Sequence, residues 1–449
     1  MKNIFKLAVT TLMLFGAMTT VQASELNKLI KSSPLDKTSV VAISVKEAET
    51  GKSVFEYNKS KLLHPASTLK VFTTFPALDA LGEDYNFQTT FYEYKNDLYI
   101  KLGADPFLNS QNLKDIAKLI KAQGYKNFKN VYFDDSIMDN VEWGIGWMWD
   151  DGTNPLMQKF SAYNLDENLA NITVSKDANG IPTVSTSSLY SMPVLNNLKA
   201  GDSNSIYAVR HDWASPDIIC LTGTVAGGAT VRVPINNMRH YFEKRLFNYF
   251  DRSKIKVENQ MTMVKQVPSG AKKIAEVKNP ATATLGSILK SSDNKTAETL
   301  AKVAGGVKYQ KRADLSSQIK VFYEYWAKNK VDTTGIMIAD ACGVSRNNLV
   351  SVDFMTNALN SLYKVKGADY MKSVLAQPGE GTLSERMLNH RGSLYLKTGT
   401  LANISGLTGY VVADNGKTYS VAILIQNFAY PMVQVKAFEN QIIEDIKKL

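Results

Sequence analysis

The stretch HPASTLK, residues 64–70, places a serine and a lysine three positions apart at the start of a helix-like apolar run. Pro65 suits the first turn of a helix, and positions i and i+3 of a helix share one face, so Lys70 can approach the Ser67 hydroxyl. A lysine in a dry site near other cations can lose its proton and act as a base for the serine. Alternatively, Ser67 caps a helix and Lys70 is solvated.

The Ser-x-x-Lys spacing does not decide between these interpretations, because it occurs seven times. The copies begin at Ser67, Ser253, Ser269, Ser287, Ser292, Ser317 and Ser361. The first copy is set apart by the apolar helical face that follows it, formed by Leu69, Phe72 and Phe75. Other parts of the chain are therefore needed to assign a function.

Two more polar groups lie far along the chain. Ser292-Asp293-Asn294 begins another helix-like run, where all three residue types are also preferred N-caps. Ser345-Arg346-Asn347 repeats the Ser-x-Asn spacing, so this pattern is not unique. Lys397-Thr398-Gly399-Thr400 lies in a strand-like segment, and Lys-Thr-Gly occurs once. A glycine inside a strand indicates close approach of a backbone or a ligand, and the alternative is an edge lysine beside an incidental bulge.

The composition predicts an exported, folded protein. The chain has 449 residues, enough for two or three domains, and 44% of them are hydrophobic. Lys2 and Lys6, an apolar run and Val21-Gln22-Ala23 predict a secretory signal peptide over residues 1–23. The apolar run is too short for a convincing membrane span. We therefore expect the mature protein to act outside the cytoplasm.

The chain is basic. Its formal net charge of +10 falls to about +8 without the two signal lysines. A basic exported protein suggests anionic neighbours, such as a membrane surface, an acidic wall polymer or nucleic acid. The basic residues are dispersed along the sequence, which argues against a nucleic-acid partner and favours a generally basic surface. Loose association with a membrane surface stays open.

Cysteine and histidine are scarce. The chain contains Cys220, Cys342 and four histidines, with no metal-ligand spacing, so we expect no metal. Export permits a disulfide, but the two cysteines fall in regions that we assign to different domains, which disfavours pairing. His64 lies in the wrong direction along a helix to serve as the base of Ser67, and we expect it to pack or to face solvent.

Two further clusters have structural explanations that we favour. Trp143, Trp147 and Trp149 fit packing within a β-rich region better than stacking on a glycan. Asp134 and Asp135 fit a turn at the end of a strand better than a metal site.

The two ends of the chain are expected to form one sheet. Residues 39–58 alternate apolar and polar side chains around the turn at 49–52, which predicts a strand hairpin. Residues 393–402, 405–414 and 418–427 are predicted as three further strands.

Helices are expected to cover this sheet. The last segment spaces Val435, Phe438, Ile442 and Ile446 as one apolar helical face. The helical stretches that begin at Ser67 and Asn294 are expected to lie on the sheet as well.

The middle of the chain differs from both ends. Residues 87–283 contain many short β-like runs separated by Asn, Gly and Asp turns. Helical patterns are confined mainly to 112–124 and 238–251. We interpret this region as one or two β-rich domains inserted into the first.

Together the three motifs resemble the signature set of penicillin-binding proteins and class A β-lactamases, in the same order on helix, loop and strand. The chain is similar in particular to low-molecular-mass class C penicillin-binding proteins, the D-alanyl-D-alanine carboxypeptidase/endopeptidase type. The 225 positions between Ser67 and Ser292 are typical of that branch. Secondary matches are GADPFL (103–108), VYFDDS (131–136), LDEN (165–168), PGEGTLSERM (378–387) and GLTGYV (406–411).

The resemblance implies an α/β (α+β) penicillin-binding/β-lactamase-like transpeptidase fold, with an antiparallel sheet flanked by helices and β-rich inserted domains. It assigns residues 24–86 and 284–449 to the catalytic domain. Residues 87–168 and 235–283 would form inserted domain II, and residues 169–234 inserted domain III.

The resemblance also implies a serine-type D-Ala-D-Ala carboxypeptidase/endopeptidase of the periplasm. Its substrates would be peptidoglycan stem peptides, β-lactam antibiotics would bind to it, and it would need no metal or cofactor. The implied catalytic residues are Ser67, Lys70, Ser292, Asn294 and Lys397.

The remaining implied roles concern substrate binding. Substrate would contact Lys397, Thr398, Gly399 and Thr400. The backbone N–H groups of Ser67 and Thr400 would form the oxyanion hole.

The chain departs from the family pattern at two places. It has Asp-Ala-Cys-Gly-Val-Ser at 340–345 where the family usually has Asp-Gly-Ser-Gly-Leu-Ser. This explains Ser345 as part of a different motif and favours Ser292 for the catalytic loop. Pro76 removes a backbone hydrogen bond from the helix after Lys70 and should kink or end that helix.

Two alternative functions stay open. The first is a non-catalytic wall-binding or scaffold protein on the same fold, although all polar catalytic positions are intact. The second is a β-lactamase, although the long insertion and the lack of a motif for a deacylating glutamate argue against it.

Overall fold

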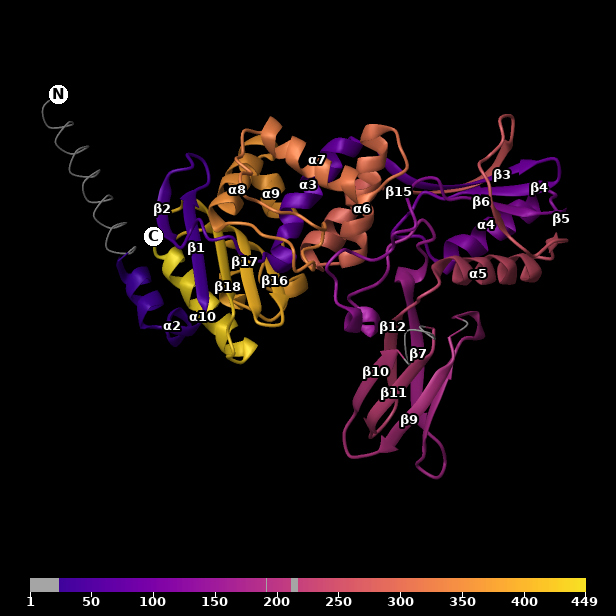
Figure 1. The fold of residues 1–449 in the computed structure, drawn as a ribbon, viewed down its shortest axis with the longest axis horizontal. Helices are drawn as coiled ribbons and strands as arrows, with labels where there is room; N and C mark the ends of the chain where they lie inside the picture. The colour runs from indigo at the N-terminus through magenta and orange to yellow at the C-terminus, as the bar shows by residue number, and fades with distance from the viewer. Residues whose placement is uncertain (1–23, 191, 211–216) are drawn as a thin grey trace, which may run out of the picture. The chain divides into compact units, whose positions relative to one another are not determined.

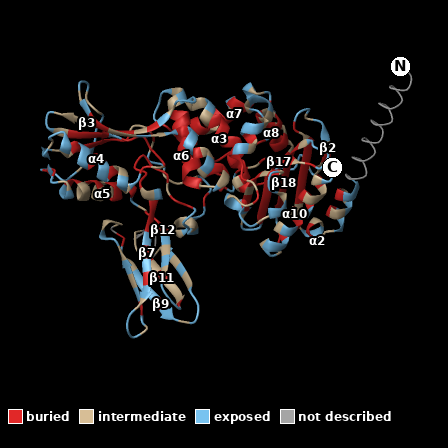
Figure 2. Cartoon of the chain, turned by 180° about the vertical axis from the view of Figure 1, so that it is seen from behind, coloured by how far each residue is buried: buried red, intermediate tan, exposed pale blue. Residues whose placement is uncertain are grey.

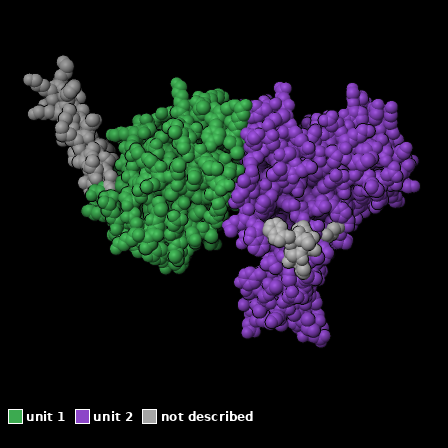
Figure 3. Space-filling view, in the orientation of Figure 1, with its two compact units in different colours: residues 1–76, 285–293, 319–449 green, residues 77–284, 294–318 purple. Residues whose placement is uncertain are grey.

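The computed structural model describes residues 24–190, 192–210 and 217–449, so the predicted signal peptide, residues 1–23, lies outside the described residues. The chain divides into two compact units (Figure 3). Unit 1 comprises the described residues up to 76 together with 285–293 and 319–449, and unit 2 comprises 77–284 and 294–318. In the part of the chain that is described, no helix combines the length and the apolar character needed to cross a membrane.

An antiparallel sheet with the strand order β16-β17-β18-β1-β2 forms the centre of unit 1 (Figure 1). Its strands are β1 (Val40–Glu47), β2 (Ser53–Tyr57), β16 (Leu394–Leu401), β17 (Ile404–Val412) and β18 (Thr418–Gln426). Val45 of β1 pairs with Val421 of β18, which confirms that strands from both ends of the chain share one sheet. The motif strand β16 lies at an edge of this sheet.

Helices α8 (Val352–Lys366) and α10 (Met432–Lys447) cover opposite faces of the sheet (Figure 1). In β17 the Ser405 hydroxyl donates to Glu439 of α10 at 2.7 Å, whereas the Tyr410 hydroxyl donates to the Leu359 carbonyl of α8 at 2.8 Å. Side chains of odd and even number point to opposite faces of a strand, which places one helix on each face.

The predicted apolar face of the last helix is confirmed. Its members are all buried: Val435, Phe438, Ile442 and Ile446. They pack against the sheet in a core with Val41, Ile43 and Leu407.

For helix α6 (Asn294–Tyr309), the expected coverage of this sheet stays a prediction. The helix belongs to unit 2, where Lys295 Nζ donates to the Pro106 carbonyl at 2.7 Å. Every residue of this helix from Asn294 to Gly306 is buried.

Helix α3 (Lys70–Leu81) continues through Pro76, so the helix does not end there as the sequence suggested. Pro76 cannot donate to the carbonyl of Phe72, four residues earlier. The indole Nε1 of the buried Trp326 donates to that carbonyl instead, at 3.1 Å. Trp326 comes from α7 (Leu315–Lys328), and its side chain replaces the backbone donor that proline removes.

Unit 2 contains a five-stranded sheet with the order β14-β6-β4-β3-β15. Its strands are β3 (Asn86–Tyr94), β4 (Asp97–Lys101), β6 (Val131–Asp134), β14 (Met263–Val264) and β15 (Lys272–Pro280). Two helices belong to the same part of the unit, α4 (Ser110–Ala122) and α5 (Met238–Arg252), together with the short parallel pair β5 (Asn127–Phe128) and β13 (Lys256–Val257).

Two three-stranded sheets, β10-β11-β9 and β12-β7-β8, complete unit 2. Their strands are β7 (Leu169–Lys176), β8 (Pro182–Thr186), β9 (Val194–Ala200), β10 (Ser205–Arg210), β11 (Ile219–Val225) and β12 (Ala229–Pro234). Figure 2 shows that β9 is largely exposed, whereas β17 and β18 of the unit 1 sheet are buried. The β-rich character of the middle region is confirmed, and the boundaries of inserted domains II and III stay predictions.

The remaining helices are α2 (Pro34–Thr38) and α9 (Ala368–Val374). Cys220 and Cys342 are both free thiols, so no disulfide joins them.

Candidate active site

Ser67 and Lys70 lie together at the start of α3. A 3-10 turn, Ala66–Leu69, carries Ser67, and the α-helix begins at Lys70. Lys70 is completely buried, and its Nζ donates to the Ser67 hydroxyl at 2.9 Å and to the Cys342 carbonyl at 2.6 Å. Ser67 is only half-buried, so its hydroxyl can meet a ligand. A buried lysine beside an accessible serine is the arrangement that a nucleophile and its base require.

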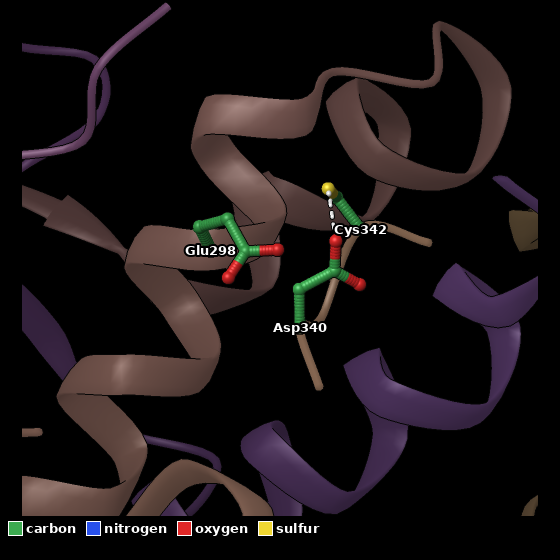
Figure 4. Close-up of side chains that lie close together, drawn as sticks. All are labelled: Glu298, Asp340 and Cys342. Carbon is green, nitrogen blue, oxygen red and sulfur yellow. Dashed lines mark hydrogen bonds between the residues drawn. The ribbon is translucent and has the colours of Figure 1, made fainter. Parts of the chain in front are cut away.

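A loop that we call the Asp340 loop, residues 339–348, holds the carbonyl that faces Lys70. The buried Asp340 carboxylate accepts hydrogen bonds from the backbone N–H groups of Gly343, Val344 and Ser345, at 2.8, 3.0 and 2.6 Å. Figure 4 shows its further contact with the Cys342 thiol, at 3.5 Å. The carboxylate thus closes the loop on itself and fixes the direction of its carbonyl groups.

The Asp340 loop is attached to the segment around Ser67 at two further points, through Thr73 and His64. Thr73 Oγ1 of α3 donates to the Ala341 carbonyl at 2.7 Å. His64 Nε2 donates to the Ser345 carbonyl at 2.7 Å, and His64 Nδ1 accepts from the Ala66 N–H at 3.1 Å. Burial lowers the pKa of His64, which favours this neutral form with one donor and one acceptor nitrogen. His64 is a packing residue, as expected, and does not contact the Ser67 hydroxyl.

The close approach of the two segments explains Gly343. Gly343 has a φ of +84°, which other residues rarely adopt. A Cβ atom at this position would lie 1.9 Å from the Ala66 carbonyl oxygen. Glycine is retained here where the family pattern also has it. At the two substituted positions beside it, the backbone carbonyls of Ala341 and Cys342 accept hydrogen bonds from Thr73 and Lys70.

Ser292 and Lys397 form a second serine–lysine pair in unit 1. Lys397 is completely buried, and its Nζ donates to the Ser292 hydroxyl at 2.8 Å and to the Thr398 carbonyl at 3.0 Å. Ser292 has a left-handed backbone with φ of 66°, just before α6 begins at Asn294. Burial, and then the charge of Lys70, place the pKa of Lys397 well below its usual range.

The edge strand β16 runs beside the Ser67 turn because Gly399 has no side chain. A Cβ atom at Gly399 would lie 3.0 Å from the Pro65 carbonyl oxygen and 3.1 Å from the Ala66 Cβ. The sequence predicted close approach of another backbone at this glycine, and this is confirmed. Thr400 is exposed beyond it, and the half-buried Thr398 hydroxyl lies 2.8 Å from the hydroxyl of Thr382.

Asn294 begins α6 and belongs to unit 2. Its side-chain amide donates to the Leu156 carbonyl at 2.8 Å and contacts Met157 Sδ at 3.6 Å. Within unit 1 the structure therefore brings together Ser67, Lys70, Ser292 and Lys397, and it anchors the side chain of Asn294 within unit 2.

The other predicted clusters have structural roles. Trp143 packs edge-on against Trp147, with ring centroids 4.9 Å apart, and Trp147 packs on Phe160. Trp149 differs, since it is 73% exposed. Asp134 ends β6 and accepts from the Ser136 hydroxyl at 2.6 Å, which confirms the predicted turn.

Sequence reasoning missed two parts of the site. The first is the Asp340 carboxylate together with the Cys342 carbonyl that contacts Lys70. Both residues lie 270 or more positions after Lys70 in the sequence. The departure from the family pattern at 340–345 drew attention to this segment without indicating that its backbone contacts the lysine. The second is Thr382, which lies in PGEGTLSERM, a stretch identified only as a secondary match.

Comparison with known proteins adds an independent finding. The profile of the D-Ala-D-Ala carboxypeptidase 3 (S13) family matches residues 22–444. A D-alanyl-D-alanine carboxypeptidase of Actinomadura sp. (strain R39) is 26% identical over 90% of this chain and 80% of its own length. The D-alanyl-D-alanine carboxypeptidase DacB of Haemophilus influenzae is 21% identical over 88% of this chain and 87% of its own.

Solved structures share the fold. The crystal structure of penicillin binding protein 4 (dacB) from Haemophilus influenzae superposes with a TM-score of 0.83 at 20% identity, covering 94% of this chain and 99% of that one. The predatory peptidoglycan endopeptidase Bd3459 from Bdellovibrio bacteriovorus superposes with a TM-score of 0.51 at 18% identity, covering 90% of this chain and 92% of that one. The expected penicillin-binding α/β fold is confirmed.

Proposed function

Because this chain belongs to the D-Ala-D-Ala carboxypeptidase 3 (S13) family, we propose that it is a serine-type D-Ala-D-Ala carboxypeptidase that works through an acyl-enzyme on Ser67. The observation that carries the proposal is the pairing of each serine with a buried lysine. Lys70 Nζ lies 2.9 Å from the Ser67 hydroxyl, and Lys397 Nζ lies 2.8 Å from the Ser292 hydroxyl. The substrates are peptidoglycan stem peptides, and penicillins acylate the same serine.

In the acylation step, Lys70 takes the proton of the Ser67 hydroxyl while Oγ attacks the carbonyl carbon of the penultimate D-alanine. The bond to the terminal D-alanine then breaks. Ser292, held by Lys397, passes a proton to the leaving amine, and free D-alanine departs. Water then attacks the ester, which releases the shortened peptide and restores the Ser67 hydroxyl.

The backbone N–H groups of Ser67 and Thr400 are proposed as the oxyanion hole. Such donors each contribute on the order of 3 kcal/mol to stabilising the tetrahedral intermediate. The contact that Gly399 permits between β16 and the Ser67 turn supports this role, because it keeps the two segments together. The edge position of β16 also leaves backbone groups for an extended substrate.

The remaining predicted residues bind the substrate in this proposal. Lys397 and Thr398 attract the terminal carboxylate, and the Thr382 hydroxyl beside Thr398 adds a further donor. Because Lys397 is fully buried, we assign it mainly to orienting Ser292, with Thr398 as the direct contact. Asn294 would hold the substrate amide.

The same acyl-enzyme serves an endopeptidase, in which the leaving group is the side-chain amine of a cross-linked peptide. The endopeptidase Bd3459 shares this fold, which makes DD-endopeptidase activity a natural second assay. The signal-peptide pattern supports export and a periplasmic location, and loose association with a membrane surface stays a prediction.

A fluorescent penicillin tests the proposal directly. Purified protein is incubated with the probe, and the adduct is mapped by peptide mass. We expect labelling at Ser67, loss of labelling in Ser67→Ala, and full labelling in Ser269→Ala, which changes an exposed Ser-x-x-Lys copy in unit 2. A folded protein that forms no adduct would support a non-catalytic role.

Product analysis then assigns the activity. Release of free D-alanine from pentapeptide muropeptides identifies a carboxypeptidase, and cleavage of cross-linked dimers identifies an endopeptidase. Rapid turnover of penicillin, in place of a long-lived adduct, would favour the β-lactamase alternative.

A further inference from the structure

Two basic segments that are far apart in the sequence lie side by side in unit 2. Residues 110–130 carry five lysines and one aspartate, and residues 238–258 carry six Lys or Arg residues and three acidic ones. The first segment contains α4 and β5, and the second contains α5 and β13 (Figure 1). The fold therefore brings together two basic segments that are more than 100 positions apart in the sequence.

Backbone and side-chain contacts hold the two segments together. Helices α4 and α5 pack on each other through buried apolar faces, among them Ile116 of α4 and Leu246 of α5. The Lys256 N–H donates to the Lys126 carbonyl at 2.9 Å, in the pairing of β13 with β5. Because the apolar faces point inward, Lys114 and Lys118 of α4 are exposed, and Lys121 of α4 and Lys244 of α5 are half-buried.

A groove of about 450 Å³ lies between the two helices. Its cationic lining consists of Lys114, Lys118 and Lys121 from α4 and Arg252 from the last turn of α5. Tyr249 and Ser253 add two hydroxyl groups. Positions 114, 118 and 121 are four and three apart, so the three lysines share one face of α4.

Lys121 connects the two sides of the groove at one end. Its Nζ donates to the Lys254 carbonyl, in the turn after α5, at 2.7 Å. The groove is therefore bridged by a hydrogen bond from one helix to the end of the other, and its shape does not depend on flexible lysines alone.

Interactions with the helix dipoles and with nearby acidic residues account for only part of the positive charge around the groove. Cations in the last turn of a helix offset the helix dipole, which accounts for Lys121 and Arg252. Lys114 lies outside the last turn of α4. Among nearby acids, Asp115 lies 3.8 Å from Lys118, but both side chains are more than half exposed, so this pair leaves most of the positive charge unbalanced.

We propose that this groove binds a ligand that carries phosphate groups. A phosphate group bears close to two negative charges, accepts several hydrogen bonds and is bound by Lys and Arg side chains and by hydroxyl groups. Four cations around one groove match such a ligand better than a single carboxylate, which would neutralise only one of them. The phosphate can come from a lipid headgroup or from a soluble phosphorylated compound.

The test compares two variants with the same change in net charge. The groove variant combines Lys114→Glu, Lys118→Glu and Arg252→Glu. The control variant combines Lys31→Glu, Lys37→Glu and Lys364→Glu, three exposed lysines of unit 1. The probes are inositol hexakisphosphate, vesicles of phosphatidylcholine with phosphatidylglycerol, and vesicles of phosphatidylcholine alone. Labelling of Ser67 by penicillin reports the integrity of unit 1 in every variant.

We expect the wild-type chain to bind at least one phosphate-rich probe and to ignore neutral vesicles. Raising the salt from about 50 to about 200 mM should weaken binding by about tenfold or more, because several ionic contacts are involved. The groove variant should lose about tenfold or more in affinity, and the control variant should stay within about twofold of wild type. Binding of the soluble probe assigns the site to phosphate itself, and binding of anionic vesicles alone assigns it to a lipid headgroup.

Either of two results would overturn the proposal. The first is equal loss of binding in both variants, which would mean that only net charge matters. The second is absence of binding to every probe by wild-type protein that is still labelled by penicillin. Both results leave the proposed peptidase function untouched, so the two proposals can fail separately.

Discussion

Lys70 and Lys397 are two completely buried lysines whose charges act on each other, and each donates a hydrogen bond to the hydroxyl of a different serine. Burial of Lys397 disfavours its charged form, and the positive charge of Lys70 adds to this effect. Because repulsion between two charges is mutual, the pair favours a state in which one lysine is neutral. A neutral lysine beside a serine hydroxyl can accept its proton.

The first prediction concerns the pH dependence of acylation. At low pH both lysines are protonated, so the rate should fall as the pH falls. Burial and the charge of Lys70 lower the pKa of Lys397, and Lys397→Gln removes this titrating group, so the acid limb of the rate profile should move. The rate at neutral pH should drop by about a hundredfold, the scale of general acid–base catalysis. Stopped-flow acylation by a fluorescent penicillin measures both effects.

Lys290 provides the matched control for this experiment. It is partly exposed and forms an ion pair with Glu380 at 3.0 Å, near the same loop as Ser292. Lys290→Gln should leave the acid limb where it is. A limb that does not move in Lys397→Gln would show that the two lysines are not coupled.

The second prediction concerns Asp340 as a positioning residue. Asp340→Asn keeps the side-chain volume and removes acceptor capacity for the N–H groups of Val344 and Ser345. The loop should then hold the Cys342 carbonyl less firmly against Lys70. We expect acylation to slow by about tenfold or more, as small misplacements of catalytic groups do.

Two readouts distinguish positioning from simple loss of stability. The noncovalent affinity for penicillin should stay near the wild-type value while the acylation rate falls. Asp353→Asn, which removes the partner of Lys46 at 2.8 Å in the same unit, should leave both unchanged. Parallel loss of affinity and rate in Asp340→Asn would argue for a structural role only.

The third prediction concerns the space at Gly399. Gly399→Ala adds a Cβ atom 3.0 Å from the Pro65 carbonyl oxygen, so β16 and the Ser67 turn must separate by a few tenths of an ångström. The proposed oxyanion donors of Ser67 and Thr400 then move apart, and acylation should slow by about tenfold or more. Gly286→Ala, whose Cβ would meet open space, should react at the wild-type rate. An unaffected rate in Gly399→Ala would remove the case for Thr400 as a donor.

The fourth prediction concerns the proline in α3. Trp326→Phe leaves the buried Phe72 carbonyl without its indole donor, which should lower the free energy of unfolding by about 1–3 kcal/mol. Pro76→Ala supplies a backbone N–H for that carbonyl. In the double variant, part of the loss, about 1 kcal/mol, should therefore be recovered. Urea unfolding of all four proteins measures the coupling, and strictly additive effects would contradict this explanation.

Local patterns were sufficient for much of the fold. The hairpin at 39–58, the strands after residue 393 and the apolar face of α10 follow from period-2 and period-3.6 patterns, and all are present. The same logic is insufficient for α6, because a helical pattern predicts burial but does not show which segments cover the helix, and every residue from Asn294 to Gly306 is buried. At Pro76 the pattern predicted a kink or an end of the helix. The helix does not end there, and the lost hydrogen bond is replaced by a side chain 250 positions away.

The sequence by itself determined the chemistry of this protein: a serine three positions before a lysine on a helix, a single Lys-Thr-Gly strand, and a family whose order of motifs the chain follows. Only the tertiary structure decided how these groups work on one another. The hydrogen bonds from Lys70 to the Cys342 carbonyl and from Lys397 to Ser292 join residues more than a hundred positions apart. The chemistry of a side chain is a property of the residue itself, whereas the burial of that side chain and the repulsion between charges depend on which distant segments the fold packs together.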